Sequence, residues 1–300
     1  MATSIVSIGL SLDGHESFSR VLLAAAFVLW LGLAAIAVDQ FLEARLEFLN
    51  AVGTPAVLTV VADTAVLGSR LVLLGWLRLA EMSLGLALAL AALLFPRVLR
   101  RWSLPTVGVS FMVPVSIESL AALVAEAALA ERQTLLAVAA AALLLAGLAT
   151  YAFVLSTFDF HQLLTGRGDH WIAGGALAIA TFACARTAQA AAALPPLNGL
   201  SDVLSNGSLA LWVASALWLP VLIASELRST RTAYDIRRWS TVFPFGMYAV
   251  CSFVTGRVAE IGWLATFARV WVWVAVAVWL AVVLELIFRE HSPHARHRRG

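Results

Sequence analysis

The sequence predicts an all-α integral membrane protein, with one polytopic domain over residues 1–288 and a short basic tail over residues 289–300. Three observations predict this class. Of the 300 residues, 61% are hydrophobic and only 13% are charged, and the mean hydropathy is +0.90. The apolar residues are gathered in runs of about 20, the length that a helix needs to cross the hydrocarbon core. The polar loops between these runs are short and leave no room for a soluble domain.

About ten apolar runs follow one another along the chain, each bounded by polar residues. In order, we expect helices over Met1–Leu12, Val21–Val38, Pro55–Trp76, Leu79–Phe95, Leu104–Ala125, Thr134–Leu155, Trp171–Ala193, Ser208–Ser225, Trp239–Gly256 and Trp263–Phe288. Most of them are long enough to span a bilayer. The first is the exception, because a helix of this length reaches only about 18 Å. We therefore expect the true start of the protein to lie upstream of Met1.

Residues that break helices, proline and glycine, occur mainly in the interior of the odd-numbered runs. Pro114 lies in the fifth run, Gly174 and Gly175 in the seventh, and Pro244 and Gly246 in the ninth. Backbone groups freed by proline must be satisfied by neighbouring helices or by water in a cavity, so irregular backbone is tolerated only away from lipid. We therefore expect the odd runs to form an inner set and the even runs, where Pro220 in the eighth is the exception, to form an outer set that faces lipid.

The distribution of arginines predicts how the protein is oriented in the membrane. One side of the alternation carries Arg45, Arg97, Arg100, Arg101, Arg167, Arg228, Arg231, Arg237, Arg238 and Arg289, and the other carries only Arg20, Arg78, Arg132, Arg257 and Arg269. Basic residues are enriched in cytoplasmic loops. Both termini are therefore expected on the cytoplasmic side of a plasma membrane. The net charge of +2 is no evidence for nucleic-acid binding, and the lipid bilayer is the expected partner.

Four ionisable residues lie deep inside odd runs: Asp63, Arg70, Glu118 and Arg186. A charge at mid-membrane costs about 3 kcal/mol or more, so each is expected to face the interior and to have a partner. Counted by helical rise from the predicted starts, Arg70, Glu118 and Arg186 lie about 21–22 Å deep and Asp63 about 12 Å deep. Glu118 is therefore level with both arginines and is expected to pair with one of them.

Two interpretations of these charges remain open. They form an outer binding site or selectivity ring for an anionic solute, or they form a buried ion-pair network that locks the inner helices together. A proton-coupled carrier that uses Glu118 or Asp63 as its proton site is a further alternative.

Enzyme signatures are weak. The loop from Asp159 to His170 holds Asp159, His161, Asp169 and His170, which are residue types that bind metals, but their spacing matches no standard site. An intramembrane enzyme built on this loop is the alternative from a different class, and a non-transporting scaffold is a third. We expect no enzyme activity, no metal and no cofactor. Cys184 and Cys251 lie in apolar runs and are expected to be packing residues.

Two segments resemble a known family. MATSIVSIGL, over Met1–Leu10, resembles the first-helix signature of the tellurite-resistance and C4-dicarboxylate transporter family, which includes the plant slow anion channels. WSTVFP, over Trp239–Pro244, resembles the W-x-x-T-F-P segment of that family's ninth helix, with Val242 in place of the threonine. The layout of ten spans also fits this family.

The resemblance implies five helical hairpins around a central pore. It also implies that a phenylalanine of the ninth helix plugs the pore; here that residue is Phe243, with Phe245 as the second candidate. The implied function is a membrane channel or transporter for small anions or C4-dicarboxylates, working without a cofactor. The implied assembly is a homotrimer.

Overall fold

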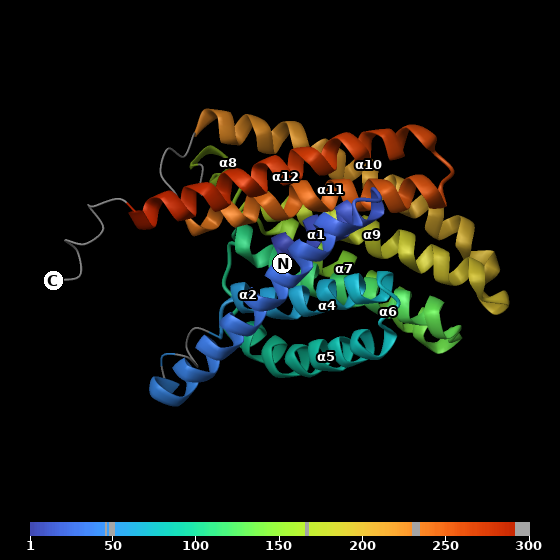
Figure 1. Ribbon diagram of the computed structural model, residues 1–300, viewed down its shortest axis with the longest axis horizontal. Coiled ribbons are helices and arrows are strands. Elements are labelled where there is room, and N and C mark those ends of the chain that lie inside the picture. Colours follow the sequence, from blue (N-terminus) through green and yellow to red (C-terminus); the bar gives the residue numbers. More distant parts are fainter. Residues whose placement is uncertain (46, 48–51, 166–167, 230–234, 292–300) are drawn as a thin grey trace.

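The computed structural model describes residues 1–45, 47, 52–165, 168–229 and 235–291. Its long helices form five antiparallel hairpins (Figure 1). The hairpins are α1 Ala2–Leu12 with α2 Glu16–Glu43, α4 Thr59–Leu73 with α5 Leu77–Arg100, α6 Met112–Glu131 with α7 Thr134–Ser156, α9 Trp171–Ala193 with α10 Asn198–Arg228, and α11 Trp239–Val258 with α12 Gly262–His291. Short helices complete the described part: η1 Pro55–Leu58, η2 Gly108–Phe111, α8 Gln162–Thr165, η3 Pro195–Leu197 and η4 Ile236–Arg238.

Eight of the helices in the described ranges are long and apolar enough to cross a membrane. With the shorter α1 and with α11, they make up the five hairpins. The protein is therefore an all-α integral membrane protein, as the composition predicts.

The first helix of each hairpin is buried and the second is exposed. In the most apolar 18-residue stretch of α9 every residue is buried, and in that of η2–α6 89% of the residues are buried. In the corresponding stretches of α2 and α12 only 6% and 17% of the residues are buried. The buried helices α1, α4, α6, α9 and α11 are the odd-numbered runs, so the inner and outer sets predicted from the helix breakers are confirmed.

The five buried helices close into a ring, which we call the inner ring. Around it, α1 contacts α4, α4 contacts α6, α6 contacts α9, α9 contacts α11, and α11 returns to α1. Each outer helix packs mainly on the inner helix of its own hairpin. In Figure 1, α2 leaves the body at a steep angle, which fits its almost complete exposure.

Left-handed residues end four of the five inner helices. Gly14 after α1 and Gly75 after α4 have φ of +88° and +76°, and Arg132 and Glu260 have φ of 54° and 56° after α6 and α11. A residue in this conformation turns the chain out of the helix at its last carbonyls. The resulting turns of a few residues bring the next helix back alongside, and they form the end of the molecule opposite α8 and the last turn of α12 (Figure 1).

Several predicted boundaries were wrong. The fifth span begins at Gly108 rather than Leu104 and extends to Glu131, and the eighth begins at Asn198 rather than Ser208. Polar residues at the membrane surface remain helical because α-helix ends extend beyond the hydrocarbon core. Pro96 lies inside the outer helix α5. Pro220 of α10 is therefore joined by a second proline inside an outer helix.

The helix α12 continues to His291, so its last turn includes the first residues of the predicted tail. The rest of the predicted tail, residues 292–300, lies outside the described residues, as do Arg167 and Arg231.

Candidate functional site

Phe243 of α11 is buried, and it packs against α9, the neighbouring helix of the inner ring. Its side chain is 4% exposed. A β-carbon added at Gly175 of α9 would overlap the Phe243 ring, with Cδ1 2.9 Å away and Cε1 closer still, and would lie 3.0 Å from Cγ of Pro244. Only glycine at position 175 therefore lets the ring approach the α9 backbone this closely. We call this the Phe243–Gly175 contact.

The remaining predicted breakers also lie in the ring. Gly246 faces Ile5 of α1, whose Cγ2 would be 2.7 Å from an added β-carbon, and Gly174 faces the hydroxyl of Tyr248 at 2.7 Å. Pro244 is the sixth residue of α11, whereas Pro114 is the third residue of α6, which follows η2 directly. The glycines therefore act as points of close approach between helices rather than as breaks in them.

Phe245 points to a different place from Phe243. Its ring stacks on Trp271 of α12, with centroids 5.6 Å apart and planes at 8°, and lies 5.2 Å from the ring of Trp171 at the start of α9. Phe245 therefore packs between α11, α12 and the start of α9, and Phe243 is the phenylalanine buried against α9 at Gly175.

Asp63 of α4 faces α1. Its Oδ1 accepts a hydrogen bond from Ser4 Oγ at 2.7 Å, and its Oδ2 lies 2.7 Å from the nitrogen of Met1. The Asp63 side chain is 12% exposed. This carboxylate therefore joins two helices of the inner ring at the end where α1 begins.

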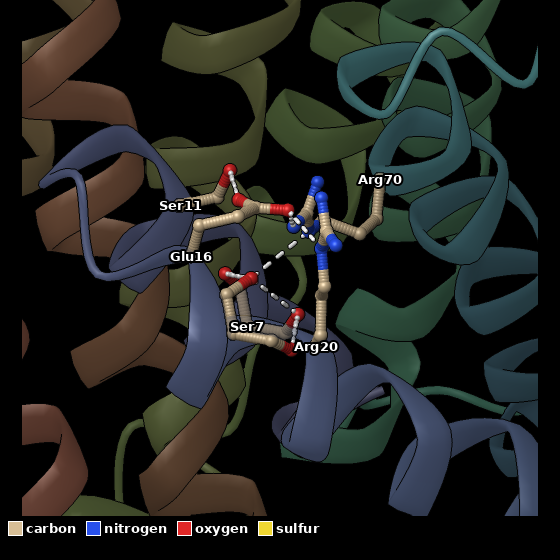
Figure 2. Close-up of polar contacts among 6 residues, drawn as sticks. Ser7, Ser11, Glu16, Arg20 and Arg70 are labelled. Carbon is tan, nitrogen blue, oxygen red and sulfur yellow. Dashed lines mark hydrogen bonds and ion pairs between the residues drawn. The ribbon is translucent and has the colours of Figure 1, made fainter.

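Arg70, near the end of α4, is fully buried and pairs with Glu16 of α2 (Figure 2). Its Nη2 donates to Glu16 Oε1 at 2.8 Å, and its Nε donates to Ser19 Oγ at 3.0 Å. The same Glu16 oxygen accepts from Arg20 Nε at 3.0 Å, and Oε2 accepts from Ser11 at 2.9 Å. Ser19 in turn donates to the carbonyl of Ser7 at 2.6 Å. The network ties the turn between α1 and α2 to α4.

Arg186 of α9 pairs with Glu126 of α6, with Nε 2.9 Å from Oε1 and both side chains nearly inaccessible. Gln189 accepts from Arg186 Nη1 at 2.9 Å, and the guanidinium carbon lies 5.1 Å from the centre of the Phe182 ring. The expected pairing of Glu118 with Arg70 or Arg186 was wrong, since each arginine has a different acidic partner. Glu126 and Glu16 were missed because each lies just outside a predicted span.

Glu118 of α6 is fully buried, and neither carboxyl oxygen has a hydrogen-bond partner among the described residues. Its side chain runs across Gly147 of α7, where an added β-carbon would be 2.5 Å from Cγ and 3.2 Å from Oε1. Glu118 therefore projects from the inner ring toward an outer helix.

The loop that suggested an enzyme is arranged as a structural junction. Gly168 N–H donates to His170 Nδ1 at 3.3 Å, Nε2 lies 3.1 Å from Ser225 Oγ of α10, and the Ser225 hydroxyl donates to the carbonyl of Leu163. Because Nδ1 accepts and the serine proton is already used, Nε2 carries the imidazole proton and donates to Ser225. His161 is exposed. Within the described ranges, no three metal-binding side chains come together.

Comparison with known proteins places these features in a family. The family model described as voltage-dependent anion channel, SLAC1, matches residues 1–287. Two similar proteins are the uncharacterized membrane proteins Rv1735c and MT1776 of Mycobacterium tuberculosis, from strains H37Rv and CDC 1551. Each is 28% identical over 123 residues, which is 39% of this chain and 62% of the relative.

The aligned part thus covers less than two thirds of those relatives. No solved structure matches the chain. The family match spans nearly the whole chain and includes both segments that carry the resemblance, Met1–Leu10 and Trp239–Pro244. The chain therefore belongs to the SLAC1 family of voltage-dependent anion channels.

Proposed function

We propose that this protein passes small anions, with C4-dicarboxylates among the candidates, across the plasma membrane through the centre of the inner ring. The observation that carries the proposal is the Phe243–Gly175 contact, in which a bulky ring from one inner helix fills the space beside a glycine of the next. Family membership supplies the solute class. No cofactor and no catalytic step are required.

Phe243 is the proposed gate. With its ring packed on Gly175 the inner helices touch and the pathway is closed, and movement of the ring away from α9 would open it. Gating by a single apolar side chain is a known device of channels, which close when an apolar constriction excludes water. Phe245, stacked between Trp171 and Trp271, would position the start of α11 rather than block the pathway.

The buried charges favour a locking role over a selectivity ring. Arg186 is neutralised by Glu126 and Arg70 by Glu16, so neither arginine presents a full positive charge to an anion. The proposed pathway is therefore mostly uncharged, and selection would depend on its width and on hydroxyl and backbone dipoles.

Anion flux into proteoliposomes tests this function. Wild type, Phe243→Ala and the control Phe27→Ala are reconstituted, and chloride, nitrate and malate are supplied separately. Phe27 lies on the outer helix α2 and is 51% exposed. We expect faster flux through Phe243→Ala only, and the ranking of the three anions would identify the solute class. Equal flux through all three folded proteins would count against the gate.

A proton-coupled carrier is the second candidate, favoured by the buried carboxyl of Glu118, which has no hydrogen-bond partner in the part of the chain that the structure describes. An intramembrane acidic residue is a functional candidate because its charged form is costly. In this mechanism Glu118 or Asp63 would take up a proton with each solute, so flux of a given anion would change with pH and become insensitive to pH in Glu118→Gln.

Orientation and assembly complete the proposal. The arginines of the described loops lie mainly at the end where the inner helices begin, so we place that end, with both termini, on the cytoplasmic side. A homotrimer is proposed from the family alone, and the mass of the purified protein in detergent would test it.

A further inference from the structure

Hydrogen bonds at three levels join the outer helix α10 to the inner helix α11, which carries the proposed gate. From the end of α11 towards its start, the bonded residues of α10 and α11 are Ser205 with Val258, Trp212 with Ser252, and Ser215 with Tyr248. The donor and acceptor atoms are 3.1, 2.7 and 2.7 Å apart, respectively. The two helices run antiparallel, so the bonds follow one another along their contact. We call this row the α10–α11 seam.

Tyr248 makes the bond of the seam that lies nearest to the gate. Its hydroxyl donates to the carbonyl of Ser215 and lies beside Gly174 of α9, where an added β-carbon would be 2.7 Å from the hydroxyl oxygen. Glycine at position 174 therefore leaves room for this bond. The Tyr248 and Ser215 side chains are both buried. The adjacent glycines of α9, Gly174 and Gly175, thus receive two rings of α11, that of Tyr248 and that of Phe243.

The seam and the Phe243–Gly175 contact restrain α11 in different ways. Apolar packing is non-directional, whereas a hydrogen bond requires a defined distance and angle. The helix α10 packs mainly on α9, so the seam ties α11 to the same hairpin that presents Gly175. Tyr248 follows Phe243 by five residues, about 7.5 Å along the helix. The helix α11 therefore cannot slide or turn at Phe243 without changing the geometry of the Tyr248 bond.

We propose that the α10–α11 seam positions the gate, with Tyr248 as its main positioning residue, an inference that rests on the proposed function. In the closed arrangement, the hydrogen bond from Tyr248 to Ser215 holds α11 at the depth and rotation that place Phe243 on Gly175. Opening breaks this bond. The bond from Trp212, one turn further along α11, restrains the helix at a second point. Tyr248 contacts no solute in this mechanism and acts through Phe243.

The substitution Tyr248→Phe removes the hydroxyl and keeps the ring. A carbonyl inside an α-helix also accepts the backbone bond from four residues later, so Ser215 keeps a partner and the variant is expected to fold. Tyr151→Phe is the matched control. Tyr151 is buried too, and its hydroxyl accepts from Trp218 Nε1 of α10 at 3.0 Å. That bond joins α10 to α7 and does not include the gate helix.

The substitution Trp212→Phe removes the bond to Ser252 and has a matched control of its own in Trp30→Phe. Trp30 Nε1 of α2 donates to Thr64 Oγ1 of α4 at 3.0 Å. Both tryptophans are partly exposed, and both donate from an outer helix to a hydroxyl of an inner helix in another hairpin. Only the bond from Trp212 ends on α11.

Anion flux into proteoliposomes, with chloride, nitrate and malate supplied separately, measures the effect on the gate. We expect basal flux to rise between about two-fold and ten-fold in Tyr248→Phe and in Trp212→Phe, as for the loss of one hydrogen bond. Tyr151→Phe and Trp30→Phe should keep the wild-type flux. In Phe243→Ala the gate is absent, so the addition of Tyr248→Phe should change flux no further. A general loss of packing would act with and without Phe243.

Access to Cys251 provides a measure that does not depend on transport. Cys251 follows Tyr248 by three residues on α11 and is fully buried. Cys184, the other cysteine, is replaced by serine, which can keep the hydrogen bond that Cys184 Sγ donates to the carbonyl of Leu204. A buried group reacts only when its surroundings open. Alkylation by N-ethylmaleimide should therefore be faster in Tyr248→Phe, by a factor similar to that for flux, and unchanged in Tyr151→Phe.

The outcomes separate the two proposals. If Tyr248→Phe matches Tyr151→Phe in flux and in alkylation while Phe243→Ala conducts faster, the role of the seam is overturned and the gate stands. Equal gains from Tyr248→Phe with and without Phe243→Ala would also overturn it. If neither wild type nor Phe243→Ala passes any anion, the proposed function fails, and faster alkylation in Tyr248→Phe would still show that the seam holds α11. If Tyr248→Phe does not fold, the comparison of Trp212→Phe with Trp30→Phe decides.

Discussion

The ring of Phe243 on α11 occupies the space that any side chain at position 175 of α9 would need. Taken alone, neither residue indicates this contact, because a glycine only lowers the stability of a helix and a phenylalanine is an ordinary core residue. Together they let two inner helices touch through one ring, and removal of that ring would leave an opening between them. The relationship makes position 175 as informative a target as position 243.

The substitution Gly175→Ala tests this relationship. The added methyl overlaps the Phe243 ring, so α9 and α11 must separate, and we expect a loss of about 1–3 kcal/mol of stability, as for other overpacked cores. The double variant Gly175→Ala with Phe243→Ala should recover most of the loss, because the space is then free. Thermal unfolding of the detergent-solubilised protein gives the comparison.

Gly85→Ala is the control for Gly175→Ala, because Gly85 of the outer helix α5 has nothing within 4 Å of an added β-carbon. It should leave stability unchanged or raise it slightly through helix propensity. If Gly175→Ala is as mild as Gly85→Ala, the two inner helices do not depend on this contact.

The ion pair between Arg186 and Glu126 supports a second prediction. Removal of one partner of a buried pair leaves an uncompensated charge and costs about 3–5 kcal/mol. We therefore expect Glu126→Gln to lower the unfolding temperature strongly, and the double variant Glu126→Gln with Arg186→Met to be more stable than Glu126→Gln alone. Unfolding monitored by tryptophan fluorescence measures both.

Glu81→Gln breaks a different pair and serves as the comparison for Glu126→Gln. Arg78 lies 3.9 Å from Glu81 and is almost fully exposed, and such surface pairs contribute little. If Glu126→Gln unfolds at the same temperature as Glu81→Gln, the ion pair between Arg186 and Glu126 does not lock the inner helices together.

The two-layer arrangement of helices was predictable from sequence, whereas the pairing of charges was not. Asp63, Arg70, Glu118 and Arg186 are all on inner helices and all buried, as the cost of a charge in lipid requires. Helical rise predicts a depth for each of them but says nothing about the direction of each side chain. Glu118 and Glu126 are eight residues apart, which leaves them about 80° apart around the helix axis at 3.6 residues per turn.

The missing partners have a related cause. Glu16 and Glu126 lie one to five residues beyond predicted spans that were ended at the first polar residues, whereas α2 and α6 include both. Similarly, the contact of Phe243 with Gly175 joins residues from two hairpins, and no local pattern specifies it. Periodicity predicts which helices are buried, and tertiary packing decides which side chains meet.

Glu118 supports a third prediction. Because its side chain lies over Gly147 of the outer helix α7, the main proposal expects Glu118→Gln to fold and to pass anions at the wild-type rate at every pH. The neutral amide has nearly the same shape as the carboxyl, which has no hydrogen-bond partner to lose in the described ranges. Flux of one anion measured across a pH series provides the test. A wild-type pH response that disappears in the variant would instead favour the proton-coupled carrier.

Arg70 and Arg20 support a fourth prediction, since both contact the same oxygen of Glu16 from different environments (Figure 2). The Arg70 side chain is fully buried, whereas that of Arg20 is 66% exposed. Arg70→Met removes the hydrogen bonds to Glu16 and Ser19 inside the protein, and we expect a loss of about 1.5–3 kcal/mol, typical of hydrogen bonds to charged groups. Arg20→Met should change stability little, because solvent screens its pair.

The two variants differ by one arginine in the same network, so each controls for the other. Limited proteolysis at the turn between α1 and α2, followed by mass spectrometry, would show whether this turn is released. We expect faster cleavage near Gly14 in Arg70→Met than in wild type, and wild-type cleavage in Arg20→Met. Equal cleavage in all three proteins would show that α1 and α2 are held by apolar packing alone, and that the buried arginine has another role in the inner ring.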